Sequence, residues 1–108
     1  MARWDEATID DRKIVDYLLS PEHPIGGDKA AFFIAVGYSL DAWTKLRDDL
    51  LSIAYDGQTA SEDSTAFGHK YVRDGVIETP TGRMIGLRTI WIADEPDSPP
   101  RLVTAYPA

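Results

Sequence analysis

The hydrophobic periodicity of the chain changes once, near Gly57, and this change constrains the fold more than any other feature. Before that glycine, apolar residues recur at helical spacing, as in the steps from Leu46 to Leu50 and on to Ile53. After it the period becomes two, most clearly in the run RMIGLRTIWIA at 83–93. The sequence therefore predicts an α+β domain in which two or three N-terminal helices are followed by a four-stranded antiparallel β-sheet.

We expect the helical part to occupy about residues 10–56. The first helix must end at Ser20–Pro21, because the residue before a proline is displaced from the α region. The turn 21–27, PEHPIGG, follows it. Caps and glycines set the remaining boundaries: Asp10 or Asp11 starts the first helix, Asp28 to Gly37 bounds the second, and Ser39 or Asp41 to Asp56–Gly57 bounds the third.

The sheet part should occupy about residues 58–107. Three strands are expected at 67–77, 83–93 and 101–107, with the last two paired as a hairpin around the loop 94–100. A weaker strand at 58–65 is expected at an edge of the sheet. Asp74–Gly75 indicates a bulge or bend in the first of the three strong strands.

Length and composition limit the class of protein. A chain of 108 residues suits a single domain, 1–108. Cysteine is absent, which excludes disulfide frameworks, thiolate nucleophiles and cysteine-based metal sites. The N-terminus lacks the features of a secretory signal, and no apolar stretch approaches the roughly 20 residues that span a bilayer. We therefore expect a cytoplasmic protein that does not act at a membrane.

The net charge of −7 is unevenly distributed. Residues 1–67 carry 13 acidic side chains against 6 Lys and Arg, whereas residues 68–108 carry 5 of each. A protein with a net negative charge is not expected to bind nucleic acid through its overall charge. The neutral sheet half is therefore where an anionic ligand is expected, although a mixed, solvated surface is the alternative.

One group of candidate functional residues lies in HPIGGDK, residues 23–29. His23 stands in a turn rich in proline and glycine, six residues ahead of Lys29 at the start of a helix. The N–H groups of a helix N-terminus suit a phosphate. The alternative is that His23 only fixes the turn through a backbone carbonyl and that Lys29 is a solvated helix residue.

A second group lies on the last strand. Period two places Thr104 and Tyr106 on one face, together with Leu102. The alternative for Tyr106 is a ring in the core with its hydroxyl at the rim. His69, at the start of a strand, and Arg101, after two prolines, are further candidates for binding a substrate. The alternatives are that His69 is simply exposed and that Arg101 positions the loop before it. Metal-ligand spacings and cofactor motifs are missing, so we expect neither a metal nor a cofactor.

The segments KIVDYLLSPEHPIGGDKAAFF, GHKYV, RTIWI and RLVTAYP resemble an uncharacterised bacterial domain family found alone or attached to toxins. The layout in turn is similar to the barnase/EndoU/colicin/RelE-type ribonuclease superfamily, whose sites combine a histidine and a basic residue with a hydroxyl and a tyrosine on late strands. This resemblance implies catalytic roles for His23, Lys29, Thr104 and Tyr106. It also implies that Arg88 binds phosphate, and His69 and Arg101 are the further candidate substrate-binding residues.

The resemblance implies a metal-independent endoribonuclease toxin that cleaves RNA by 2′-OH attack and leaves a 2′,3′-cyclic phosphate. Its partners would be RNA and a cognate antitoxin or immunity protein. The alternative is a non-catalytic protein-binding module from a toxin–antitoxin or phage-related pair. The acidic helical half favours that alternative, since inhibitors often present negative charge to a basic partner.

Overall fold

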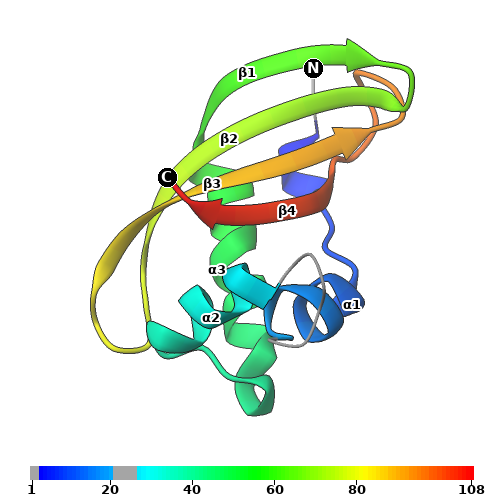
Figure 1. Cartoon of the computed structure of the whole chain (residues 1–108). Coiled ribbons are helices and arrows are strands. Elements are labelled where there is room, and N and C mark those ends of the chain that lie inside the picture. Colours follow the sequence, from blue (N-terminus) through cyan, green and yellow to red (C-terminus); the bar gives the residue numbers. More distant parts are fainter. Residues whose placement is uncertain (1–2, 21–26) are drawn as a thin grey trace.

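The computed structural model describes residues 3–20 and 27–108, and it has the α+β layout that the sequence predicts. The helical segments come first: η1 (Trp4–Glu6), α1 (Asp11–Lys13), η2 (Ile14–Leu18), α2 (Gly27–Ala35), η3 (Leu40–Ala42) and α3 (Trp43–Asp56). An antiparallel sheet follows, in the order β1 (Gln58–Thr65), β2 (Gly68–Glu78), β3 (Met84–Ala93) and β4 (Arg101–Pro107). Figure 1 shows α1 and α2 next to β4, while α3 runs across the sheet behind the strands.

The first predicted helix changes its hydrogen bonding along its length. Asp10 caps α1, and its carboxylate accepts a hydrogen bond from the backbone N–H of Arg12 at 2.9 Å. From Ile14 the helix widens into the π-helical turn η2, in which the N–H of Leu19 donates to the Ile14 carbonyl at 2.8 Å. Such turns are rare and are frequent at functional sites. This one contains Tyr17.

The second and third helices lie close to their predicted positions. α2 begins at Gly27, one residue before the predicted cap Asp28. The chain then turns at Gly37, whose φ of 107° is a conformation that glycine adopts without strain. α3 ends at Asp56, as predicted, and buries the expected apolar stripe: Leu46, Leu50, Ile53 and Ala54.

The segment that the sequence predicts as a weak edge strand is a complete strand of eight residues, β1. It forms one edge of the sheet, and all its side chains are exposed. Its polar and acidic composition suits this place, since charged side chains keep an edge strand from pairing with other chains. β4 forms the opposite edge.

Of the bulge or bend predicted at Asp74–Gly75, the bulge is wrong. β2 pairs with β3 without interruption from His69 to Glu78. The glycine serves close packing instead, because a Cβ at Gly75 would lie 2.8 Å from Cγ1 of Ile53 on α3.

An irregularity in β4 changes which side chains share a face. Leu102 pairs with Trp91, but Thr104 pairs with the preceding residue of β3, Ile90, so one residue of β4 is extra. Directly opposed residues point to the same face of a sheet. Thr104 and Tyr106 therefore share one face as predicted, but the expectation that Leu102 lies on that face is wrong.

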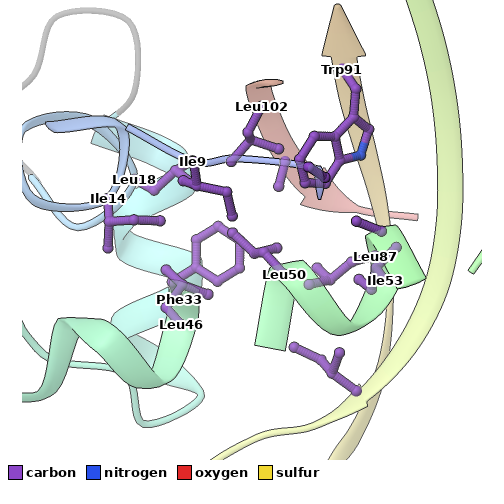
Figure 2. Packing of buried hydrophobic residues seen from close by; sticks show 14 of the residues in the cluster. Ile9, Ile14, Leu18, Phe33, Leu46, Leu50, Ile53, Leu87, Trp91 and Leu102 are labelled. Carbon is purple, nitrogen blue, oxygen red and sulfur yellow. The ribbon is translucent and has the colours of Figure 1, made fainter. Parts of the chain in front are cut away.

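The core fills the space between the helices and one face of the sheet (Figure 2). Trp91, Phe33 and Leu50 are completely buried there. The buried Thr89 accepts a hydrogen bond from the indole N–H of Trp91 at 2.7 Å and donates to the Arg73 carbonyl at 2.7 Å, so its burial is compensated.

The described helices leave the opposite face of the sheet uncovered. In β3 the buried residues alternate with half-exposed ones, and the half-exposed set includes Arg88, Ile90 and Ile92. Thr104 and Tyr106 extend this face onto β4. The sheet therefore offers an open face that ends at the edge strand nearest α1 and α2.

Candidate functional site

Three side chains from three separate elements meet at the β4 edge. The ammonium group of Lys29, in the first turn of α2, donates a hydrogen bond to the phenol oxygen of Tyr17 at 2.8 Å. The same phenol oxygen is 3.1 Å from Oγ1 of Thr104 on β4, and either hydroxyl can donate. Lys29 and Thr104, which are 75 positions apart in the sequence, thus contact the same phenol group.

Local features of each element set this geometry. Tyr17 lies on the π turn η2, whose buried residues Ile14 and Leu18 fix the turn against the core. Lys29 lies in the first turn of α2, two residues after Gly27, where the positive end of the helix dipole adds to the charge of the lysine. The extra residue in β4 places the side chain of Thr104 on the open face of the sheet. All three side chains remain partly exposed, so a ligand can reach them.

The electrostatics of this cluster lower the pKa of Tyr17. Burial raises the pKa of the phenol, but hydrogen bonds from Lys29 and Thr104, and the positive charges of Lys29 and Lys13, lower it by more. The net pKa of Tyr17 is therefore below its ordinary value of 10.0. The Lys13 ammonium lies 5.5 Å from the centre of the Tyr17 ring and that of Lys29 lies 5.3 Å from it, so two cations are close to the phenol.

Tyr106 joins the cluster through Lys29, whose ammonium lies 5.9 Å from the centre of the Tyr106 ring. Arg88 pairs with Tyr106 across the sheet and lies on the same face. Its guanidinium donates two hydrogen bonds to the Asp74 carboxylate, at 2.9 and 2.8 Å. These bonds lower the pKa of Asp74 and raise that of Arg88. Arg88 is thus held in a fixed orientation next to Tyr106.

The structure brings together Lys29, Thr104, Tyr106 and Arg88 among the residues predicted from the sequence. His23 lies outside the described residues. Arg101 lies further along β4, where its guanidinium donates to the Asp94 carboxylate at 3.1 Å.

His69 lies apart from this cluster. It pairs with the buried Ala93, so it points to the helical side of the sheet, and its Nδ1 is 3.3 Å from the Ser64 hydroxyl. There it lines a separate pocket of about 530 Å³ with Trp4, Tyr71 and Arg73.

Tyr17 is the residue that the sequence did not indicate. It stands between Asp16 and Leu18 in a helix whose apolar stripe accounts for its neighbours, and nothing in that spacing marks a functional phenol. The available signal was its position next to the stripe, where the ring can pack while the hydroxyl reaches the surface.

Chemically, the cluster provides a phenol with a lowered pKa, and a cation and a neutral hydroxyl that are each within hydrogen-bonding distance of that phenol. A phenolate held by an ammonium can accept a proton, and the ammonium can stabilise a nearby anion. Within residues 3–20 and 27–108, no three His, Asp or Glu side chains are grouped so that they could hold a metal ion. The helices in these ranges are also too short or too polar to cross a membrane.

Residues 1–108 match the DUF6883 family, described as a domain of unknown function, and the chain belongs to that family. No curated protein sequence matches the chain. The fold is similar to that in a contact-dependent growth inhibition toxin–immunity protein complex from Klebsiella pneumoniae 342. The TM-score is 0.72 at 16% sequence identity, over 93% of this chain and 98% of that chain. At this identity, the likeness shows a shared fold.

Proposed function

We propose that this DUF6883 domain is a toxin-type endoribonuclease that cleaves RNA by attack of a ribose 2′-OH and needs no metal ion. The observation that carries the proposal is the hydrogen-bonded set of Lys29, Tyr17 and Thr104 at the β4 edge. It places a proton acceptor, a cation and a hydroxyl where an RNA backbone lying on the open face of the sheet can reach them.

The reaction exchanges one bond to phosphorus for another. The 2′-oxygen loses its proton to a base and bonds to the adjacent phosphorus, and the bond from phosphorus to the 5′-oxygen breaks. An acid then protonates the departing 5′-oxygen. The products are a 2′,3′-cyclic phosphate and a 5′-hydroxyl, and DNA is excluded because it lacks the attacking group.

We assign the base to Tyr17. Its pKa lies below the ordinary value, which increases the fraction of phenolate near neutral pH. Lys29 holds that phenolate and stabilises the negative charge that develops on the phosphoryl oxygens, a contribution that is often the largest in such reactions. Thr104 donates its one hydroxyl hydrogen to the phenolate and orients it, and once the phenol has taken up the proton this hydrogen can turn to a non-bridging oxygen of the phosphate.

The remaining predicted residues complete the assignment. His23 is proposed as the acid, since an ordinary histidine pKa of about 6.5 suits proton donation near neutrality. Tyr106 stacks a base or orients the scissile phosphate, and Arg88 binds phosphate with the guanidinium that Asp74 orients.

The likeness to a chain of a toxin–immunity complex supports a role in such a pair, with a cognate immunity protein as the partner. A non-catalytic, immunity-type role is the second candidate. The observation that favours it is the charge of −7, concentrated in residues 1–67, which would suit an inhibitor of a basic toxin.

Induced expression in a bacterium without a cognate immunity protein tests the proposal. We expect growth arrest with the natural sequence, and normal growth with Tyr17→Phe or Lys29→Gln. Tyr55→Phe and Lys45→Gln, on α3 and away from the cluster, serve as matched controls that should still arrest growth. Harmless expression of the natural sequence at levels equal to the controls would favour the immunity-type role.

A further inference from the structure

A second hollow lies on β4, immediately beside the Lys29–Tyr17–Thr104 cluster. It has a volume of about 470 Å³, which is within the range of small-molecule sites. Its lining comes from the segment before α1, from Lys13 at the end of α1, from Ile92 of β3 and from residues 101–103 of β4. Backbone pairing fixes this wall, since the N–H of Leu102 donates to the Thr8 carbonyl at 3.0 Å.

The hollow is continuous with the proposed catalytic cluster in two ways. Val103 lines it and is the residue before Thr104, about 3.3 Å along the strand. Lys13 also lines it, and the same side chain lies over the Tyr17 ring. A polymer whose reacting phosphate lies at Tyr17 would therefore place its neighbouring unit in this hollow.

The chemistry of the lining suits one nucleotide. The half-exposed Ile92 and Val103 form an apolar floor on which a base can pack, whereas Ile9 and Leu102, which also line the hollow, are buried in the core. Two cations, Lys13 and Arg101, stand among them. The carboxylate of Asp10 also lines the hollow but is already engaged by the backbone N–H of Arg12 as a helix cap.

The cations are available to a phosphate. Arg101 contacts the exposed Asp94 through one nitrogen, and exposed ion pairs of this kind contribute little. Two cations thus line one hollow in a chain with 18 acidic side chains against 11 Lys and Arg.

We propose that this hollow, lined by Lys13, Arg101 and the apolar floor, binds the RNA nucleotide next to the cleaved phosphodiester. Lys13 and Arg101 bind its phosphate, and the base packs on Ile92 and Val103. The proposal rests on the proposed ribonuclease function, because it uses the same RNA strand and the same edge of the sheet.

The test is a binding measurement that does not require cleavage. A fluorescent single-stranded RNA with 2′-O-methyl groups throughout cannot undergo 2′-oxygen attack. Its affinity is measured by fluorescence anisotropy over a salt series for the natural sequence, for Lys13→Gln/Arg101→Gln, and for the charge-conserving Lys13→Arg/Arg101→Lys. The double variant Lys45→Gln/Arg47→Gln on α3 removes the same charges elsewhere.

Each phosphate contact to a single strand contributes about 0.7 to the slope of log affinity against log salt. We expect Lys13→Gln/Arg101→Gln to reduce this slope by about 1.4 and to weaken binding by roughly tenfold or more at low salt. The charge-conserving and the α3 variants should keep the natural slope. Thermal unfolding of each variant verifies that it is folded.

Two results would overturn the proposal: no binding of this RNA by the natural protein, or equal slopes for Lys13→Gln/Arg101→Gln and the α3 control. A third outcome is that the natural protein binds this RNA, with the expected smaller slope for Lys13→Gln/Arg101→Gln, and yet cleaves no unmodified RNA. In that case the nucleotide site stands and the ribonuclease function fails. The two claims therefore fail separately.

Discussion

Replacing Tyr17 by phenylalanine removes one oxygen atom and keeps the ring. The ring contacts of Lys29 and Lys13, at 5.3 and 5.5 Å from the ring centre, stay available. The losses include the hydrogen bonds with Lys29 and Thr104, at 2.8 and 3.1 Å. A part-buried hydrogen bond contributes about 0.5–1.5 kcal/mol, so Tyr17→Phe should lower the free energy of unfolding by about 1–3 kcal/mol. The protein should remain folded.

The effect on RNA cleavage should be much larger. Loss of a positioned general base typically lowers the rate by about 10² to 10⁴. The pH dependence carries further information. If the Tyr17 phenolate is the base and His23 is the acid, log kcat/KM rises with pH up to the histidine pKa of about 6.5, stays level up to the pKa of Tyr17, which lies below 10.0, and falls above it. Tyr17→Phe should remove the rise at low pH, and Lys29→Gln should move the fall to higher pH because it removes a cause of the lowered pKa.

The assay is cleavage of a fluorescent RNA oligonucleotide at several pH values, with urea unfolding of the same samples. Tyr55→Phe is the matched control, because Tyr55 is half-exposed on α3 and outside the cluster. A folded Tyr17→Phe protein with natural cleavage rates and an unchanged pH profile would refute the assignment of Tyr17 as the base.

Three further predictions concern the fold. Asp74→Asn should lower the Tm at pH 7 but much less at pH 2. Arg88 holds the pKa of Asp74 below 3.8, so the ionised carboxylate stabilises the fold above that pH, and this stabilisation is lost when the carboxylate is protonated in acid. Equal losses of Tm at both pH values would contradict this. Gly75→Ala should destabilise by about 1–3 kcal/mol in urea unfolding because the new Cβ meets Ile53 at 2.8 Å. Gly86→Ala, with its nearest neighbour at 3.9 Å, should be nearly neutral, and similar losses for both would count against the packing argument. Phe33→Ala, in the buried core, should cost about 3–5 kcal/mol, and a loss below about 1 kcal/mol would place Phe33 outside the core.

The order and type of the elements could be predicted because local patterns determine them. Asp10 as a cap, Gly37 as a turn and the alternation in β3 each act within a few residues. The π turn at Ile14–Leu18 could not be predicted, since its sequence is that of an ordinary amphipathic helix. The wrong bulge at Gly75 has a similar reason: a glycine in a strand indicates either a bulge or close packing, and only the approach of Ile53 decides between them.

The composition of the candidate site could be predicted in part. Lys29, Thr104 and Tyr106 stood out as polar groups in positions where chemistry is common, and the structure places them together. Their link, Tyr17, depends on the π turn and on the strand pairing of β4, which are tertiary features. The register shift in β4 also decides that Thr104 faces away from the core, and no sequence pattern marks that extra residue.

The central claim is that this chain cleaves RNA through the Lys29–Tyr17–Thr104 cluster without a metal ion. Its most direct test is incubation of purified protein with total RNA in the presence of EDTA, followed by analysis of the fragment ends. We predict fragments with 2′,3′-cyclic phosphate and 5′-hydroxyl ends, and far fewer of them from Tyr17→Phe or Lys29→Gln at equal protein concentration and time. Intact RNA, or fragments ending in 3′-hydroxyl and 5′-phosphate, would contradict the claim.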